Sequence, residues 1–495
     1  MLLTCSYVCL SVYAPAKTSQ SHRHGPIPDQ LRHLSCHLPH TPGEPAHSEE
    51  RAAKKQDHKK PDDAKPAESS NTKHPQRDFY WAYALAMGAD WLQGPYLYSL
   101  YQDEHGLSPG QVSSLFTTGF LSGAVSGFFV GSLADKYGRK MSCVLFCVLY
   151  ALSCFLTMVP VVPLLFLGRA LGGISTSILF TSFDSWMVTD FKKRKLVEKG
   201  CDLSRTYGTM GTINSLVAMA SGVASEGLVR LTGTKKSPFI ASAALLWMAM
   251  QTIWCWDENY GHAAEEKSDA KKSDAKKSDA KKSDAKKSDA KKGDAKSDGT
   301  ASQPSLSSVL RRPAVLALVF ATTMFEGSMY LFVFCWVPAL QAVQTTEGEL
   351  PYGLIFSSYM ACVMAASLTF NLVMQRRLLK YSRLLVGLLV MANFVFVKLC
   401  GPRDESVTFW LFCLFEACVG FYWPCIGYLK GRMIDDGNRA KVYSMMRIPL
   451  NIFVVVSLMM TRDSDGFMRV FSICSVCLTA AFGAVWASTF TEAVP

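Results

Sequence analysis

The sequence predicts an all-α polytopic membrane protein with twelve transmembrane helices in two six-helix halves. Hydrophobic residues make up 49% of its 495 residues. From about residue 79 onward they gather in runs long enough to cross roughly 30 Å of hydrocarbon as helices. Lys and Arg concentrate in alternate loops between these runs, which is typical of a chain threaded repeatedly through a bilayer.

Twelve apolar runs account for the predicted helices. Several contain Gly or Pro, which bundled membrane helices tolerate better than soluble helices do. The runs fall near residues 79–101, 110–133, 141–159, 161–189, 206–229, 237–256, 313–340, 352–374, 382–400, 407–429, 442–461 and 467–490.

The chain divides into four predicted segments. Residues 1–76, rich in His, Pro, Ser and Lys, form a predicted disordered N-terminal extension, whose brief apolar start is too short to span a bilayer. Residues 77–256 form the first six-helix half and residues 313–491 the second. Between them, residues 257–312 carry a KKSDA repeat with almost no apolar side chain to bury, which predicts a solvated linker rich in lysine.

The positive loops predict the orientation of the chain. By the positive-inside rule, both termini and the lysine-rich linker are cytoplasmic. The formal net charge of +11 therefore reflects membrane topology rather than a basic face for nucleic acid. We expect the lipid bilayer to be a partner and nucleic acid not to be one.

Four ionisable residues lie deep within predicted helices: Asp90, Arg169, Glu326 and Glu416. At about 1.5 Å per residue, each lies roughly 12 to 20 Å from the start of its helix. An isolated charge at this depth costs at least about 2.5 kcal/mol. These side chains are therefore expected to face one hydrated cavity, to pair with each other or to be protonated. A buried ion pair between Asp90 and Arg169 that only fixes helix packing is the structural alternative.

The two halves echo each other in sequence. Arg169 and Glu416 each precede a glycine by four positions, and Asp90 and Glu326 are each followed at +6 and +8 by aromatic residues. Parallel six-helix repeats are a known plan of transporters, with the substrate site at the interface near the midplane.

The loop after the second run carries a recognisable motif. It reads GSLADKYGRK and fits the pattern G-x-x-x-D-x-x-G-R-[RK] through Gly131, Asp135, Gly138, Arg139 and Lys140. This resembles the signature of the major facilitator superfamily, and GRALGGIST is similar to its second motif. Further segments resemble the eukaryotic molybdate-anion transporter family, namely ADWLQGPYLYSLY, GRKMSCVLF, GRALGGISTSILFTSFDSW, DENYG, FEGSMYLFVFCWVPAL, GLIFSSYMA, YWPCIGYL and RIPL. The N-terminal extension, the lysine-rich repeat and the second-half loop QRRLLKYS depart from this pattern.

The resemblance implies a secondary active transporter that takes up molybdate across the plasma membrane by alternating access. It also implies that helices 1, 4, 7 and 10 line the central cavity, and the four deep charges lie on these helices. A guanidinium offers forked donors that match two oxygens of a tetrahedral oxyanion, so Arg169 is the first candidate to bind substrate. Further candidates are Arg447, Ser175, Thr176 and Asn451, although ordinary helix packing is the stronger explanation for each of the three neutral side chains.

The carboxyl groups are candidates for proton coupling. A dianion that enters against an inside-negative potential meets about 2.3 kcal/mol per charge per 100 mV. Protons that enter with it would cancel this charge, because buried carboxyl groups can bind protons on one side and release them on the other. We therefore assign this role, as a hypothesis, to Asp90, Glu326 and Glu416.

The motif loop is a predicted gate. In the superfamily it braces the cytoplasmic ends of helices through ion pairs, so Gly131, Asp135, Gly138, Arg139 and Lys140 are assigned to gating. Asp184 or Asp190 on the fourth helix is the expected partner of Arg139.

Other functions remain open at this point. Sulfate carries the same charge and shape as molybdate, so residue types do not separate them, and a sugar or organic anion is a further alternative. A membrane sensor or scaffold that no longer translocates is the rival from another class. The chain shows no P-loop, H-E-x-x-H or Ser-His-Asp pattern, and no CxxC pair with a second ligand set. We therefore expect no enzyme activity, cofactor or metal.

Overall fold

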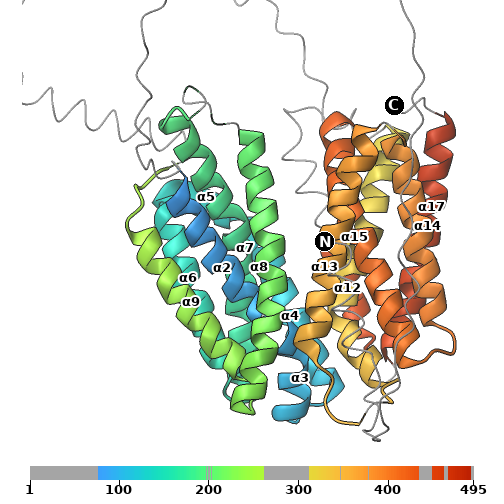
Figure 1. Ribbon diagram of the computed structural model, residues 1–495, viewed down its shortest axis with the longest axis horizontal. Helices are drawn as coiled ribbons and strands as arrows, with labels where there is room; N and C mark the ends of the chain where they lie inside the picture. The colour runs from blue at the N-terminus through green and yellow to red at the C-terminus, as the bar shows by residue number, and fades with distance from the viewer. Residues whose placement is uncertain are drawn as a thin grey trace, which may run out of the picture. The chain divides into compact units, whose positions relative to one another are not determined.

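The computed structural model describes residues 76–196, 198, 201, 203–260, 312–345, 347–376, 378–433, 449–461 and 466–491. All regular elements in these ranges are helices (Figure 1). The predicted N-terminal extension, most of the linker and Arg447 lie outside the described residues.

Helices occupy all twelve predicted apolar runs. The first half contains α2 (Arg77–Gln93), η1 (Gly94–Tyr96), α3 (Leu97–Ser99), η2 (Leu100–Glu104), α4 (Pro109–Gly127), α5 (Val130–Tyr137), α6 (Arg139–Thr157), α7 (Val162–Lys193), α8 (Leu203–Thr232) and α9 (Ser237–Trp254). The second half contains α12 (Pro313–Gln341), α13 (Tyr352–Gln375), α14 (Tyr381–Leu399), α15 (Glu405–Met433), the helix Pro449–Met459 and α17 (Gly466–Thr491). Within the described ranges, seven helices are long and apolar enough to cross a membrane, and α4 with α5 makes an eighth if counted as one span.

Two of the predicted helices are interrupted. The first run changes from α-helix to the 3₁₀ turn η1 at Gly94–Pro95 and ends in the π-helical turn η2. Proline has no N–H to donate to the preceding turn, which accounts for the break. The second run bends by 52° between α4 and α5. Each run is therefore one predicted span made of more than one element.

The two halves repeat one pattern of helix packing. In the first half α2 packs on α9, α4 on α7, and α6 on both α7 and α9. In the second half the equivalent helices do the same: α12 packs on α17, α13 on α15, and α14 on both α15 and α17. This confirms the prediction of two six-helix halves of like topology.

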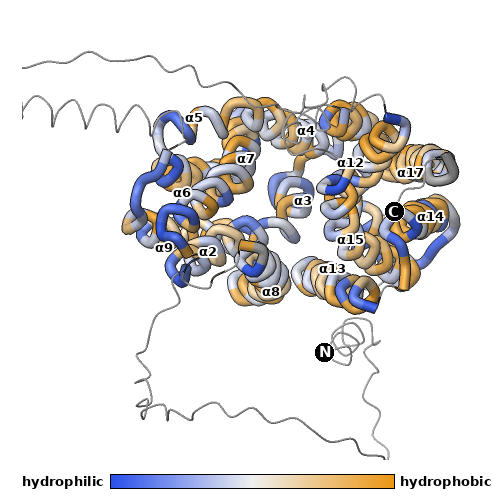
Figure 2. The backbone as a smooth tube through the Cα atoms, turned by 90° about the horizontal axis from the view of Figure 1, so that it is seen from above, coloured by the Kyte–Doolittle hydropathy of each residue, from blue (hydrophilic) through white to orange (hydrophobic). Residues whose placement is uncertain are grey.

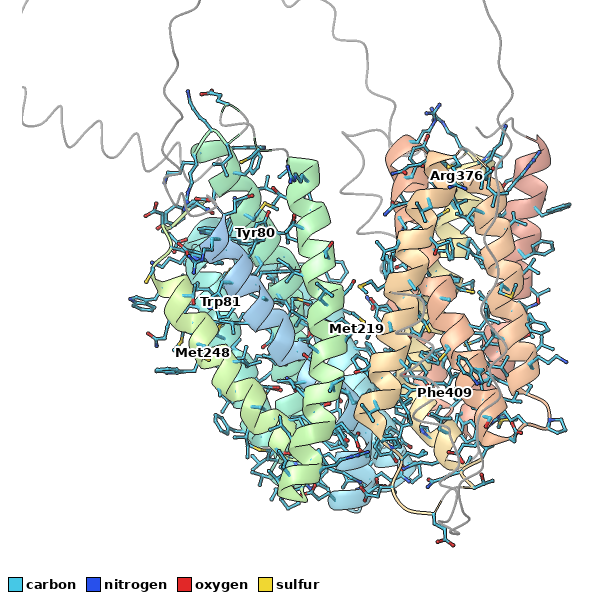
Figure 3. All side chains as sticks on the ribbon, in the orientation of Figure 1. Tyr80, Trp81, Met219, Met248, Arg376 and Phe409 are labelled. Atoms are coloured by element: carbon cyan, nitrogen blue, oxygen red, sulfur yellow. The ribbon has the colours of Figure 1, made fainter. Side chains whose placement is uncertain are left out.

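Apolar side chains cover much of the helical surface. Trp81 and Met248 lie on the first half (Figure 3), and both side chains are exposed. Apolar stretches run along helices of both halves, with hydrophilic residues gathered at the ends of several of them (Figure 2). Extensive exposed apolar surface of this kind is what a lipid-facing protein presents.

The halves meet along α8 and α13, which lie side by side (Figure 1). Gly222 and Gly353 bring the two backbones together, since a Cβ at Gly222 would lie 2.6 Å from the Gly353 carbonyl oxygen. One turn away, the Ser357 hydroxyl donates to the Met219 carbonyl at 2.8 Å. A second contact joins α4 to the helix Pro449–Met459 and the residues that follow it, where the Ser113 hydroxyl donates to the Leu458 carbonyl at 2.5 Å.

Candidate transport site

The guanidinium of Arg169, on α7, lies in an apolar cradle formed by Phe116 and Gly119 of α4. Its Cζ lies 5.1 Å from the centre of the Phe116 ring, close enough for a cation–π contact. A Cβ at Gly119 would lie 2.6 Å from Nη2, so a larger residue there would require the guanidinium to move. The Nε atom is buried without a hydrogen-bond partner. Among the described residues, Arg169 therefore keeps donors that no protein group satisfies.

Asp90 on α2 is half-buried and accepts a hydrogen bond from the hydroxyl of Tyr150 on α6. Asp90 and Arg169 influence each other electrostatically, but the described residues contain no ion pair between them. The alternative in which these two residues form a packing ion pair is therefore not what the structure shows. Tyr150 was not identified from the sequence.

Ser175 and Thr176 bond within their own helix. The Ser175 hydroxyl donates to the Leu171 carbonyl at 2.8 Å, and the Thr176 hydroxyl donates to the Gly172 carbonyl at 2.9 Å. Their protons are thus already donated to the backbone, which favours the packing interpretation of both residues. Asn451 is half-buried on the helix Pro449–Met459.

Glu326 on α12 is buried against α15. Its Oε1 accepts a hydrogen bond from the Tyr422 hydroxyl at 3.0 Å and from Lys430 Nζ at 3.1 Å. The sequence pattern places Lys430 in a cytoplasmic loop, and this is wrong: α15 continues to Met433. Helical side chains lean toward the helix N-terminus, so Lys430 reaches back into the membrane-spanning part. The signal was its position directly after an apolar run, with no turn residue between.

Glu416, also on α15, has different surroundings from Glu326. It is buried, it interacts electrostatically with Cys362 on α13, and it has no hydrogen-bond or ion-pair partner among the described residues. The four deep charges thus occupy three separate surroundings: Asp90 with Arg169, Glu326 with Lys430, and Glu416 alone. This differs from the expected single cluster, because each helix turns its charge toward a different neighbour.

The predicted gate loop is ordered around two glycines and an arginine. Gly138 has a φ of 113°, a conformation that residues with a Cβ rarely adopt. Arg139 pairs with Asp135 at 2.7 Å, and it donates to the Ser185 carbonyl at 3.2 Å and to the Thr189 hydroxyl. A Cβ at Gly131 would make only an ordinary contact with α7.

The expected partners of Arg139 are corrected by these contacts. Asp190 pairs with Arg194 at 2.8 Å, and Asp184 lies beside Tyr207 of α8. Residues four apart on a helix face each other, so Asp135 with Arg139 and Asp190 with Arg194 are the pairs that local geometry favours. Neither Asp184 nor Asp190 was needed to neutralise Arg139.

Glu258, which was not identified from the sequence, contacts the motif loop. Its carboxylate accepts hydrogen bonds from the backbone N–H groups of Lys140 at 2.8 Å and Met141 at 3.1 Å, which are free donors in the first turn of α6. A Cβ at Gly138 would lie 2.6 Å from the same carboxylate. The Lys140 ammonium lies 5.8 Å from the centre of the Trp254 ring. Glu258 therefore ties the end of α9 to the motif.

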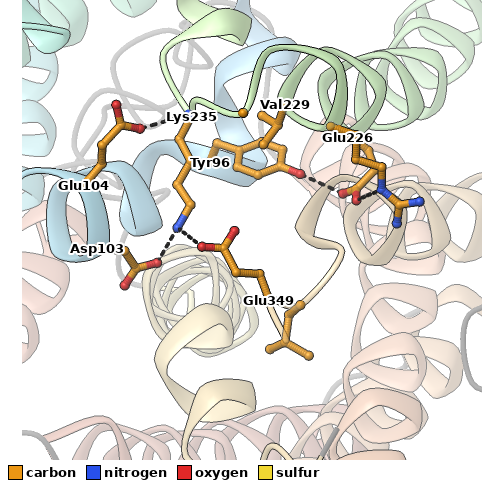
Figure 4. Close-up of a pocket in the computed structure, with 10 residues that line it drawn as sticks. Tyr96, Asp103, Glu104, Glu226, Val229, Lys235 and Glu349 are labelled. Carbon is orange, nitrogen blue, oxygen red and sulfur yellow. Dashed lines mark hydrogen bonds and ion pairs between the residues drawn. The ribbon is translucent and has the colours of Figure 1, made fainter. Parts of the chain in front are cut away.

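A cavity of about 520 Å³ opens where the two halves meet, and charged residues line much of it (Figure 4). Lys235 pairs with Asp103 at 2.7 Å and with Glu349 of the second half at 3.4 Å. Glu226, which lines this cavity, is buried. None of the four deep charges lines this cavity.

Glu226 bridges the halves. It accepts from the Tyr96 hydroxyl at 2.6 Å, from Arg230 Nε at 2.7 Å and from the Gly353 backbone N–H at 3.1 Å. Gly353 lies at the first turn of α13, whose free N–H groups favour a carboxylate. Glu226 and Lys235 thus close the end of the molecule opposite the predicted cytoplasmic loops.

The sequence of this chain is similar to those of known proteins over most of its length. A family model described as sugar transporters with 12 TM matches residues 55–293 and 289–402. The molybdate-anion transporter of Xenopus tropicalis is 30% identical over 435 residues, which covers 84% of this chain and 88% of the relative. This chain belongs to the molybdate-anion transporter family of the major facilitator superfamily. The Takifugu rubripes molybdate-anion transporter is likewise 30% identical, over 458 residues, covering 86% of this chain and 90% of that protein.

Solved structures show the same fold at low sequence identity. A mutant of the nucleoside transporter NupG superimposes with a TM-score of 0.59 at 11% identity, covering 83% of this chain and 98% of that one. A mutant of the peptide transporter POT in complex with sulfate gives 0.60 at 12% identity, covering 83% and 94%. The molybdate-anion transporter family member described here is thus a multi-pass membrane protein with the major facilitator fold.

Proposed function

We propose that this protein is a secondary active transporter that carries molybdate into the cytosol by alternating access, coupled to protons. The observation that carries the proposal is the guanidinium of Arg169, which is held in an apolar cradle with donors that no described residue satisfies. The named function of the family's relatives supports the choice of substrate.

Arg169 suits a tetrahedral oxyanion. Its planar fork can donate to two oxygens of one dianion, and charge-assisted hydrogen bonds of this kind are roughly twice as strong as neutral ones. The Phe116 ring and Gly119 both lie against the guanidinium. Arg447 and Asn451 are retained as secondary contacts, and Ser175 and Thr176 support the helix that carries Arg169.

Protons are the proposed coupling ion. Two protons cancel the charge of molybdate, so the membrane potential no longer opposes its entry. Asp90, Glu326 and Glu416 are the proposed carriers. Glu416 fits this role because a carboxylate buried without a partner costs far more free energy than its protonated form does.

Alternating access requires two gates that open in turn. The Asp135–Arg139 contacts, with Gly131, Gly138 and Lys140, form the proposed cytoplasmic gate. The contacts of Glu226 and Lys235 across the halves form the proposed external gate, which is closed in this structure. Both termini and the linker 257–312 are proposed to be cytoplasmic, and the plasma membrane is the proposed location.

Transport of a sugar is the second candidate, because the matching family model is described as sugar transporters. The two candidates make opposite demands on Arg169: an uncharged sugar does not need a guanidinium, whereas a dianion does. Competition by sulfate or by sugars against labelled molybdate separates them.

Uptake of radiolabelled molybdate into liposomes that contain the purified full-length protein tests the proposal. An imposed inward pH gradient should increase uptake, and Arg169→Gln should lower kcat/KM at least about tenfold, equivalent to about 1.4 kcal/mol of lost binding. Arg432→Gln is a matched control, since Arg432 is an exposed arginine on α15. Full uptake by Arg169→Gln would exclude the proposed site.

Removal of residues 265–298 separates a transporter from a scaffold. A transporter should keep its molybdate flux without the lysine-rich repeat. A protein that binds partners through this repeat would lose them and show no flux in either form.

A further inference from the structure

Asp90 and Arg169 carry opposite charges in the membrane-spanning part of the first half, yet they form no ion pair within the described ranges. The two side chains are close enough to interact electrostatically. Opposite charges attract most strongly where the dielectric constant is low, so a carboxylate and a guanidinium at this depth would be expected to join. Their separation therefore needs a structural cause.

The side chain that holds Asp90 is Tyr150 of α6. Its hydroxyl donates a hydrogen bond to Asp90 Oδ1. Hydrogen bonds to an ionised carboxylate are charge-assisted and roughly twice as strong as neutral ones. Tyr150 is only 8% exposed, and its ring lies 5.4 Å from the ring of Phe146. The ring is therefore packed in place, and its hydroxyl holds the Asp90 carboxylate toward α6.

Helix α6 is fixed to α7 on both sides of Arg169. The Ser153 hydroxyl donates to the Gly168 carbonyl at 2.7 Å. A Cβ at Gly172 would lie 3.0 Å from Ser153 Oγ and 3.9 Å from Tyr150 Cε2. Residues three apart on a helix share a face, so Gly172 places the Tyr150 ring on the face of α7 that carries Arg169. Tyr150 and Arg169 accordingly interact electrostatically.

We infer that Tyr150 is a positioning residue of the transporter, which holds Asp90 away from Arg169 and so keeps the guanidinium available to the oxyanion. This inference rests on the proposed function and adds a residue to the same site. Without the Tyr150 hydroxyl, the Asp90 carboxylate would compete with molybdate for the donors of Arg169. Tyr150 acts through Asp90 and needs no contact of its own with the substrate.

The unsatisfied donor of Arg169 supports this inference. Its Nε is buried without a hydrogen-bond partner, and a buried donor left unpaired costs free energy. Tyr101 also interacts electrostatically with Arg169, and Cys154 with Asp90. Tyrosine and cysteine of ordinary pKa are neutral at pH 7, so Asp90 is the anionic group among these four. A structure that leaves Arg169 Nε unpaired must keep this carboxylate away from it, and the bond to Tyr150 does so.

Molybdate exchange by the reconstituted full-length protein tests this inference. Liposomes loaded with molybdate are diluted into labelled molybdate, with equal pH on both sides, so that no proton gradient drives the exchange. The proteins compared are the wild type, Tyr150→Phe, Asp90→Asn and the double variant Asp90→Asn with Tyr150→Phe. KM and kcat for molybdate are measured for each.

Tyr150→Phe removes only the hydroxyl group. It should raise KM about tenfold and change kcat less, because the residue is proposed to act on binding. Asp90→Asn places an uncharged amide beside Arg169, so no carboxylate competes there for the guanidinium. Adding Tyr150→Phe to Asp90→Asn should therefore leave KM at the value of Asp90→Asn alone. Such non-additivity is expected when one residue acts through another.

The double variant also separates positioning from other roles. If Tyr150 only packed the helices or touched the substrate, its substitution would raise KM equally with Asp90 and with Asn at that position. Partial misfolding does not imitate the expected result, because KM does not depend on the fraction of folded protein. Tyr428→Phe, which alters an exposed tyrosine on α15, should match wild type.

The inference is overturned if Tyr150→Phe keeps the wild-type KM, or if the double variant shows the same rise in KM as Tyr150→Phe. Arg169→Gln distinguishes this failure from that of the proposed function. A high KM in Arg169→Gln beside a wild-type KM in Tyr150→Phe would reject the inference alone. Failure of the wild type to exchange molybdate would refute the proposed function, and the inference with it.

Discussion

Gly119 lies directly against the guanidinium of Arg169, so closely that a Cβ at Gly119 would come within 2.6 Å of Nη2 and 3.1 Å of Cζ. The two residues belong to α4 and α7, which pack against each other along the first half. The position of the proposed substrate contact therefore depends on a glycine 50 residues away in the chain.

Gly119→Ala should displace the guanidinium and raise the KM for molybdate about tenfold, the effect of losing about 1.4 kcal/mol of binding. The melting temperature of the purified protein should change little, because alanine is the better helix former. Gly211→Ala on α8, where a Cβ meets nothing within 4 Å, is the matched control. An unchanged KM in Gly119→Ala would show that Arg169 does not need this cradle.

Glu226→Gln should loosen the closed end of the molecule. The substitution removes the charge that pairs with Arg230 and faces the first turn of α13. Hydrogen bonds to charged groups contribute about 1.5 to 3 kcal/mol, so the closed state should lose roughly that amount. Hydrogen–deuterium exchange at the start of α13 should become faster.

Lys236→Gln is the control for that experiment, because Lys236 pairs with Glu104 at 3.6 Å within the first half. Its exchange at α13 should match wild type. Equal protection in Glu226→Gln and wild type would mean that the glycine contact alone holds this end shut.

Gly138→Ala should destabilise the motif loop by about 1 to 3 kcal/mol, since the φ of 113° is strained for a residue with a Cβ. The new Cβ would also press on the Glu258 carboxylate. Thermal unfolding of the detergent-purified protein measures the loss. Gly387→Ala on α14, which has open space around its Cβ, should leave the melting temperature unchanged or slightly raised.

Arg139→Gln should alter turnover more than affinity. The substitution removes the ion pair to Asp135 and weakens the contacts to Ser185 and Thr189 on α7, none of which lies at the proposed substrate contact. A gate mutant changes the rate of the conformational step, so kcat for molybdate uptake should change several-fold with KM nearly constant. A rise in KM at constant kcat would place Arg139 in the binding site instead.

The sequence predicted the helices well because span length and hydropathy are local properties. Ion pairs between residues four apart can be predicted equally well. Asp135 with Arg139 and Asp190 with Arg194 follow from helix geometry alone. The prediction of Asp184 as the partner of Arg139 was wrong because Asp135, four residues earlier on the chain, already pairs with Arg139.

Contacts between residues far apart in the chain could not be predicted from the sequence. Glu226 was readable as a neighbour of Arg230, but its contact with Gly353 depends on how two halves of the chain dock. The sequence pattern placed Lys430 in a loop, and only the packing of α12 on α15 brings it to Glu326. The separate surroundings of the deep charges follow from helix rotation, which a single sequence does not determine.

The close contact between Gly222 of α8 and Gly353 of α13 offers a way to arrest the transport cycle. Backbone meets backbone at Gly222 and Gly353, and a Cβ at Gly353 would lie 2.8 Å from the Glu226 nitrogen. A glycine-to-alanine substitution at either position should therefore prevent α8 and α13 from packing in this way, and it leaves every charged residue in place. Such a variant would enrich the opposite conformer for imaging or for raising conformation-selective binders.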